Sequence, residues 1–336
     1  MAELLVPVAE IQAIREHPDA DALEIAEVLG WQLVVRKGTH SVGQRIVYVP
    51  PDAIVPVEVS DAVGVTRYLQ KGRVRAARLR GEPSFGFTLE VPDPAWPLGT
   101  NCAGHFGITK YQPPSKLTAG DAERDHALFV RYTTIENLRN YPDMIRPDEA
   151  VMATEKIHGT NCRVGHISGE WMAGSNNLRR KQPETDWSQN IYWMPLSIAG
   201  VKALVESFVA DGAKQVILFG EVFGKVQKLT YGLPGRLGFR AFDLLVDGRY
   251  LDAAAFRAAC NSHGVEMVPV VAEGLFGELD LRALAEGHTL IGGDHYREGV
   301  VIRPLVERHD ATYGRVIGKY ISDTYLTGGV EDEAHD

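Results

Sequence analysis

The sequence has few cysteines, no long apolar segment and no excess of positive charge. Its three cysteines, Cys102, Cys162 and Cys260, lie far apart, are odd in number and lack the spacing of a metal site. This argues against a disulfide framework and favours a reducing compartment, with the cysteines in packing roles. No apolar run reaches the roughly 18 residues of a membrane span, and residues 1–5 lack the basic start of a signal peptide. We therefore expect a cytoplasmic chain with no membrane partner.

The net charge of −9 excludes an overall positive field that would attract nucleic acid. A nucleic-acid partner would have to be bound by a local basic patch. With 336 residues and 45% hydrophobic content, the chain is long enough to bury a sizeable core, and its length favours two domains.

The first third of the chain consists of short β-rich runs separated by turn residues, with little helix. This pattern predicts a small barrel. The segments 17–23 and 25–28 resemble the opening of OB-type RNA-binding modules. A stretch rich in breakers follows residue 111, so we place an OB-like domain at residues 1–115 and a linker at 116–125. The predicted strands are Val6–Ile14, Leu23–Val28, Gln32–Val35, Arg45–Val49 and Val74–Leu79.

Five cations fall within ten residues of this domain. Such a stripe, with Tyr68 and Phe85 nearby, suits a phosphate backbone with a stacked base, and we predict that it binds RNA. The alternative is that the cations form the solvated face of an alternating strand. The five residues are Lys71, Arg73, Arg75, Arg78 and Arg80.

Residues 126–336 mix strands with amphipathic helices, which predicts an α+β fold. Apolar residues at helical spacing predict a helix from about Ile198 to Gly212, and Asp252 and Gly264 bracket a second one. The predicted strands are 150–153, 162–165, 216–222, 239–246, 298–302 and 316–320.

Polar residues interrupt these apolar strands, and there we expect chemistry. Glu221 and Glu298 each place a carboxylate in a buried strand, which is costly unless the group is paired or binds a metal or ligand. Phe242 beside an acid suits stacking on a base, although a lone phenylalanine is ordinarily core. Lys319 can meet a phosphate as a point charge.

Lys156 stands where one predicted strand ends and the chain reverses through Gly159. We interpret Lys156 as a nucleophile. Free lysine has a pKa of roughly 10.4, so a nucleophilic lysine needs burial, a neighbouring cation or a metal to expose its lone pair. The alternative is a solvated surface lysine.

The order Lys-x-His-Gly, Gly-Glu-x-x-Gly, Phe-Asp, Glu-Gly-Val-Val and a final lysine strand resembles the covalent nucleotidyltransferases, the superfamily of polynucleotide ligases and capping enzymes. The resemblance covers about residues 126–326. His158 in the first motif, the segment 224–232 and the amino-terminal position of the OB-like module resemble the bacterial ATP-dependent RNA ligases that seal nicks. The resemblance implies that residues 126–336 form the nucleotidyltransferase (adenylylation) domain, built of antiparallel sheets with flanking helices.

The resemblance also implies a role for each motif residue. Lys156 would carry AMP, with Glu155 and Ile157 near the adenine. Asn161 would reach a phosphate, and Glu221 the ribose hydroxyls or a metal-bound water. Phe242 would stack on adenine, Glu298 would hold the metal through water and Lys319 would meet the α-phosphate. Two positions depart from the family pattern. In the segment 174–180 an asparagine stands where the family has the serine that precedes its basic residue, so Arg179 is only a candidate, and Ile321 replaces the second lysine of the last motif.

The implied reaction has three transfers. A lysyl-AMP forms from ATP, AMP moves to an RNA 5′-phosphate, and a 3′-hydroxyl seals the strand. The expected cofactors are ATP, as substrate, and Mg²⁺ or Mn²⁺; the expected partner is RNA, and we expect a monomer. Two alternatives remain open: a ligase that joins DNA or adenylates ends, and a tRNA-binding, nucleotide-sensing protein without catalysis.

Overall fold

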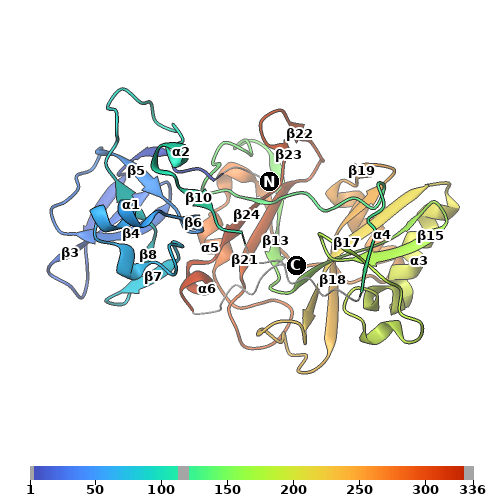
Figure 1. Cartoon of the computed structure of the whole chain (residues 1–336). Coiled ribbons are helices and arrows are strands. Elements are labelled where there is room, and N and C mark those ends of the chain that lie inside the picture. The colour runs from blue at the N-terminus through green and yellow to red at the C-terminus, as the bar shows by residue number, and fades with distance from the viewer. Residues whose placement is uncertain (1–3, 113–120, 329–336) are drawn as a thin grey trace. The chain divides into compact units, whose positions relative to one another are not determined.

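The computed structural model describes residues 4–112 and 121–328, which form two compact units (Figure 1). The first unit comprises residues 4–112 and also takes in Arg139–Tyr141 and Leu326–Gly328. The second unit holds the remainder of the described chain. The predicted boundary near residue 115 falls outside the described residues. Residues 121–125, predicted as the end of the linker, instead contribute a short strand to the main sheet of the second unit.

The first unit is built from small antiparallel sheets around two apolar clusters. Its sheets have the orders β1-β5-β9, β2-β3-β4, β7-β8 and β10-β6. Val47 and Val49 lie in one cluster, whereas Ile46 and Tyr48 lie in the other, so alternate residues of one strand fill both. The elements are β1 Val8–Glu10, β2 Ala13–Glu16, β3 Leu23–Val28, β4 Trp31–Arg36, β5 Arg45–Val49, β6 Ala53–Ile54, α1 Val57–Ala62, β7 Ala76–Leu79, β8 Glu82–Phe85, β9 Phe87–Leu89, α2 Ala103–Phe106 and β10 Thr109–Lys110.

The second unit contains a seven-stranded sheet, β11-β16-β15-β14-β17-β18-β19, and a five-stranded sheet, β12-β24-β21-β13-β20. Strands β12 and β24 run parallel, and the other paired strands of these two sheets run antiparallel. The strands are β11 Ala122–Glu123, β12 Glu136–Asn137, β13 Ala150–Lys156, β14 Thr160–Ile167, β15 Glu170–Gly174, β16 Arg179–Arg180, β17 Gln215–Gly224, β18 Leu237–Val246, β19 Arg249–Tyr250, β20 Val270–Leu275, β21 Gly299–Pro304, β22 His309–Asp310, β23 Gly314–Arg315 and β24 Gly318–Ile321.

The two predicted helices are present as α3 (Ala199–Ala210) and α4 (Ala253–His263), and two short helices follow, α5 (Leu281–Ala285) and α6 (Asp323–Thr327). Gly264 ends α4 in the left-handed conformation, as its position predicts. The Asp252 side chain does not cap the helix; it accepts a hydrogen bond from the Glu307 main-chain nitrogen instead.

The seven-stranded sheet buries both of its faces. Val216 and Leu218 of β17 pack with Leu204 of α3 and Phe256 of α4 in the main core. The intervening residues of β17 point the other way, into a second cluster with Ile317 and Val301 of the segments that form the five-stranded sheet. The two sheets therefore face each other across the side that α3 and α4 leave uncovered.

A buried charge network stands at one end of this space. The fully buried Asp243 accepts hydrogen bonds from the Tyr132 hydroxyl (2.8 Å) and from Arg303 (2.9 Å), and it pairs with Arg315 at 2.6 Å. Glu307 pairs with both arginines. Because every buried charge in this network has an opposite partner, the network satisfies the condition under which buried charges are tolerated.

In the parts of the chain that the structure describes, none of the helices combines the length and the apolar character needed to cross a bilayer.

Candidate active site

Lys156 is the last residue of β13, and β14 returns four residues later. In the turn between them, a Cβ on Gly159 would lie 2.3 Å from the Val222 carbonyl oxygen and 2.9 Å from Cγ of Glu221. Only glycine lets this turn pass so close to β17. The predicted strand end and chain reversal at Lys156 are both present.

A cavity of about 500 Å³ lies between the two sheets of the second unit. Alternate residues of β13, Met152, Thr154 and Lys156, form part of one wall, together with residues of β21 and β24. Residues of β14, β17 and β18 form the opposite wall. The predicted residues that line it are Glu155, Lys156, Ile157, Asn161, Glu221, Phe242 and Lys319.

Two carboxylates flank the lysine. Lys156 Nζ donates to Glu298 Oε1 at 2.5 Å, and both side chains are largely buried. Glu221 lies on the facing sheet and retains partial exposure toward the cavity. Desolvation raises the pKa of Glu221 to about 8, Lys156 lowers it and Glu298 raises it. Lys156 is thus held between two acids, one of which keeps its proton near neutral pH in this state.

Glu155 lines the cavity and is also held by two groups of the segment before β21, so its contact with adenine or its surroundings stays a prediction. Its Oε1 accepts from the Thr289 hydroxyl at 2.5 Å, and its Oε2 accepts from the Leu290 main-chain nitrogen at 2.7 Å. The residue therefore ties the segment before β21 to the strand that carries Lys156. Ile157 is buried against Phe223 and Tyr231, at the base of the turn.

The remaining motif residues face the cavity from several strands. Asn161 pairs with Glu221 across β14 and β17, and its buried Oδ1 has no hydrogen-bond partner in the described structure. Phe242 is half-buried, with its ring 4.9 Å from that of Tyr132. Lys319 lies opposite Val301 in the pairing of β21 with β24. An aromatic ring, an amide and a second lysine thus line the same cavity as Lys156.

Arg179 does not line the cavity. It lies on β16 and pairs with Glu123 of β11 at 3.0 Å and with Glu170 at 3.6 Å. Asn176 and Asn177 of the preceding turn line the cavity instead. The predicted nucleotide contact of Arg179 remains a prediction.

The predicted RNA-binding stripe of the first unit is divided by its internal contacts. Arg73 is buried, pairs with Asp52 at 2.6 Å and stacks over the Tyr111 ring at 3.7 Å. Arg78 donates to the Gly81 carbonyl and to Thr327. Lys71 and Arg80 are exposed, and Arg75 is half-buried and donates to Gln70. Only part of the stripe therefore presents its charge to a solvent-borne partner.

Sequence reasoning missed several residues around the lysine. Arg303 and Tyr132 line the cavity, while Tyr231 and Tyr325 hold the turn after Lys156. Arg303 follows the Glu-Gly-Val-Val motif on the same strand, so the period-two alternation from Gly299 could have placed it in the cavity. No sequence signal marks Tyr325, which is 167 positions from its partner His158.

Comparison with known proteins identifies the family and the fold. The sequence model of the RNA ligase family matches residues 149–321, from the start of β13 to the end of β24. The chain belongs to the RNA ligase family. A model of an OB-fold domain matches residues 5–91, so the predictions of an RNA ligase and of an amino-terminal OB-fold module are both confirmed. No curated protein sequence matches the chain.

Solved structures of the Naegleria gruberi RNA ligase share the fold of this RNA ligase over almost its whole length. A lysine-to-methionine variant with AMP and manganese has a TM-score of 0.75 at 22% identity, covering 95% of this chain and 97% of that chain. A lysine-to-alanine variant with ATP and manganese has a TM-score of 0.76 at 22% identity (96% and 98%). The form with pyrophosphate has a TM-score of 0.75 at 22% identity (97% and 98%). At this identity, the likeness establishes the common fold.

Proposed function

We propose that this RNA ligase is ATP-dependent and joins RNA 3′-hydroxyl and 5′-phosphate ends through a lysyl-AMP on Lys156, with nick sealing as its task. The observation that carries the proposal is the placement of Lys156. Its amine lies 2.5 Å from Glu298, in a cavity whose walls also present Glu221, Phe242 and Lys319. A lysine nucleophile, an aromatic stacking group and a phosphate-binding cation are the parts that an adenylyl transfer needs.

The Naegleria gruberi ligase supports these roles by analogy. Its solved variants replace a lysine and a glutamate that are 142 positions apart, the same separation as that of Lys156 and Glu298 here. Another of its variants replaces an aspartate two positions after that lysine, where this chain has His158. The shared spacing supports the lysine and glutamate assignments, and the difference marks His158 as a position where the two proteins diverge.

The residues present fit Mg²⁺ or Mn²⁺. Glu221 and Glu298 offer hard oxygen ligands. Burial, together with the Glu298 carboxylate, raises the pKa of Glu221, an effect that a bound cation would offset. No group of three or more histidine, cysteine or acidic residues suited to a metal occurs in the described ranges 4–112 and 121–328. Mg²⁺ is usually bound by one or two carboxylates and completes its coordination with waters and substrate phosphates, so a site with two acidic residues suits it. When bound, the cation would offset phosphate charge and favour the neutral amine of Lys156.

Several side chains of the cavity contribute to the first step, the transfer of AMP from ATP to Lys156. Phe242 stacks on the adenine ring, and Lys319 offsets charge on the α-phosphate. Glu298 Oε1 is the base within hydrogen-bond reach of the Lys156 ammonium, which must lose a proton before it attacks phosphorus. The N–P bond forms as the bond from phosphorus to the pyrophosphate oxygen breaks, and pyrophosphate leaves.

The first unit is proposed to bind the RNA duplex around the nick, with Lys71, Arg75 and Arg80 as backbone contacts. We further propose a cytoplasmic location, because all three cysteines are buried free thiols, and we propose that the protein is a monomer.

Labelling with α-³²P-ATP tests the function. The wild-type protein is expected to become labelled in the presence of Mg²⁺, whereas Lys156→Ala and Lys156→Arg remain unlabelled. Lys156→Arg keeps the charge beside Glu298, so its failure separates the nucleophile from the ion pair. Both variants are expected to seal a nick whose 5′-phosphate is already adenylated, because the lysine serves only the first transfer. The exposed Lys202 provides a control, and Lys202→Arg keeps its labelling. Labelling of Lys156→Ala would refute the assignment.

Comparing nicked RNA, nicked DNA and single-stranded RNA then tests the substrate. Nicked RNA duplex is expected to be sealed fastest. Transfer of AMP to ends without sealing would instead favour an end-adenylating enzyme.

A further inference from the structure

Two buried tyrosine hydroxyls hold the turn that follows Lys156. The Tyr231 hydroxyl accepts from the His158 main-chain nitrogen at 2.6 Å. The Tyr325 hydroxyl lies 2.8 Å from Nδ1 of His158, and His158 itself is almost fully buried. One tyrosine therefore fixes the backbone of the turn, while the other fixes the orientation of the imidazole.

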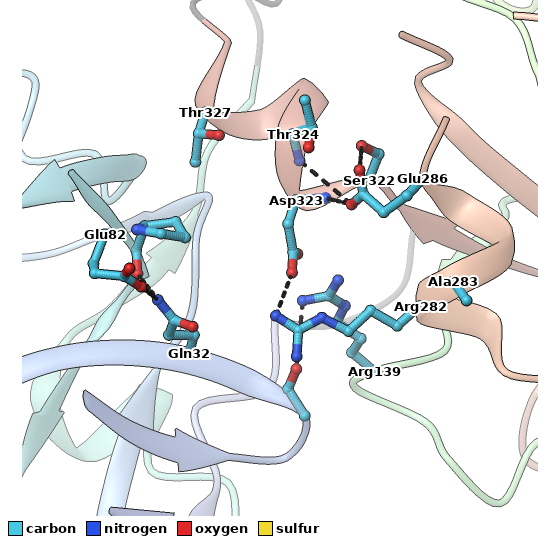
Figure 2. A network of polar contacts seen from close by, with 12 residues as sticks. Gln32, Glu82, Arg139, Arg282, Ala283, Glu286, Ser322, Asp323, Thr324 and Thr327 are labelled. Carbon is cyan, nitrogen blue, oxygen red and sulfur yellow. Dashed lines mark hydrogen bonds and ion pairs between the residues drawn. The ribbon is translucent and has the colours of Figure 1, made fainter. Parts of the chain in front are cut away.

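Tyr325 is in turn placed by a polar network around the start of α6, drawn in Figure 2. Glu286, just after α5, accepts from the Ser322 hydroxyl at 2.9 Å and from the Asp323 main-chain nitrogen at 2.6 Å. The Ser322 hydroxyl also accepts from the Tyr325 main-chain nitrogen at 3.0 Å, and Arg282 pairs with Asp323 at 3.0 Å. The carboxylate of Glu286 thus fixes the first turn of α6, from which Tyr325 projects to His158.

The same network reaches the second acid of the site. The Ser322 main-chain nitrogen donates to the Glu298 carbonyl oxygen at 3.0 Å. Ser322 therefore touches the residue that pairs with Lys156, and Tyr325 touches the turn that carries Lys156. Both ends of the Lys156–Glu298 pair are anchored to one short segment, residues 322–325.

We propose that Tyr325 is a positioning residue for lysine adenylylation, acting through His158, and that Glu286 supports it by fixing the start of α6. This inference rests on the proposed function. A phenol can donate to or accept from Nδ1, and in either case the contact with the Tyr325 hydroxyl sets the angle of the His158 ring. Adenylylation needs the lysine in line with the leaving pyrophosphate, and small misplacements of reacting groups cost about 10- to 100-fold in rate.

The test compares Tyr325→Phe with the wild type in single-turnover labelling by α-³²P-ATP at saturating ATP and Mg²⁺. We expect the rate of lysyl-AMP formation to fall by about 10- to 100-fold, with little change in the KM for ATP, because the hydroxyl orients the turn and does not line the cavity. Sealing of a pre-adenylated nick is expected to change less than threefold.

Ser60→Ala is the control. The Ser60 hydroxyl is also buried and donates to the Val57 carbonyl oxygen at 3.1 Å, but it lies in the first unit, outside the apolar cluster that Leu326 packs against. We expect this variant to lose thermal stability and to keep the wild-type rate of labelling. If Ser60→Ala slowed labelling as much as Tyr325→Phe, the effect would be one of general stability and the inference would be wrong.

A double-mutant cycle shows whether Tyr325 acts through His158. His158→Gln removes the ring nitrogen that Tyr325 contacts, so adding Tyr325→Phe to His158→Gln should cost less than twofold further. Independent effects, multiplying in the double variant, would overturn the inference, as would an unchanged rate in Tyr325→Phe. Glu286→Gln, which weakens the same network one step further out, should slow labelling in the same direction by a smaller factor. Absence of labelling in the wild type would instead refute the proposed function and, with it, this inference.

Discussion

Glu221 offers a stability test that depends on pH and needs no substrate. Burial in the wall of the cavity and the nearby Glu298 carboxylate raise the pKa of Glu221 to about 8, against the lowering effect of Lys156. The ordinary glutamate value is roughly 4.3. Between these two values the unfolded chain has lost the proton that the folded chain still holds, so rising pH favours unfolding in this window.

The slope follows from proton linkage. One group that is protonated only in the folded state lowers the free energy of unfolding by about 1.4 kcal/mol per pH unit. Over the window from about pH 5 to pH 8, the total from Glu221 is on the order of a few kcal/mol, and it levels off above pH 8. Glu221→Gln keeps the shape of the side chain and removes the titration. We therefore expect the variant to gain stability relative to the wild type as the pH rises, and to show little difference near pH 5.

Urea denaturation of the protein without nucleotide or metal at pH 5, 6.5, 8 and 9 measures this difference. Lys156→Met provides the opposite control, because removing the cation that lowers the pKa of Glu221 should extend the pH-dependent loss above pH 8. Addition of Mg²⁺ or Mn²⁺ to the wild type at pH 7.5 should release protons, and the release should be smaller in Glu221→Gln. A stability difference that is constant from pH 5 to pH 9 would show that Glu221 is ionised throughout and would refute the reasoning.

Three further outcomes are expected. Gly159→Ala should lower thermal stability and abolish labelling by ATP, because its Cβ would stand 2.3 Å from the Val222 carbonyl oxygen; wild-type labelling would contradict this. Arg315→Met should lower the free energy of unfolding, measured by urea denaturation, by about 3–5 kcal/mol, because the buried Asp243 would lose one of its two arginine partners. A loss under 1 kcal/mol would show that Arg303 alone compensates the charge of Asp243. Neutralising Lys71, Arg75 and Arg80 together should reduce the salt dependence of RNA binding by about one log-log unit per lost phosphate contact, measured by fluorescence anisotropy, without changing thermal stability; an unchanged slope would place the RNA elsewhere.

The chemistry of the site could be predicted from the sequence because it breaks local rules. Glu221 and Glu298 put charges next to or within apolar strands, and Lys156 stands between a strand and a glycine turn. These positions cannot be explained by packing alone, so they point to a ligand. The strands that carry them coincide with apolar runs, so in the second unit the predicted strands agree with observed ones to within a few residues. In the first unit the predicted strand Val6–Ile14 is wrong, because β1 and β2 divide it between two sheets.

The supporting contacts could not be predicted in this way, because their partners are far apart in the sequence. In the sequence, nothing distinguishes Glu155 from other acidic residues. In the fold, its carboxylate accepts hydrogen bonds from Thr289 and Leu290, which lie 134 and 135 positions later. Arg73 belongs to a run of cationic residues in the sequence. The fold pairs its guanidinium with the Asp52 carboxylate and stacks it over the Tyr111 ring. A run of cationic residues therefore predicts a charged, solvent-exposed surface only for those residues that form no ion pair or stacking contact within the fold.

The first unit includes segments from later in the chain, and this affects how its proposed role in RNA binding should be tested. Leu326 packs with the apolar cluster that contains Trp31 and Phe85, and Thr327 accepts from Arg78, so the last residues of α6 belong to this unit. Arg139 belongs to it as well, because its guanidinium lies 4.2 Å from the Trp31 ring. Deleting residues 1–113 would thus remove the core around Leu326, the residue that directly follows Tyr325, and would disturb α6 together with RNA binding. Substituting the exposed cations leaves Leu326 and Arg139 in place, and it therefore tests RNA binding without altering the segment that orients His158.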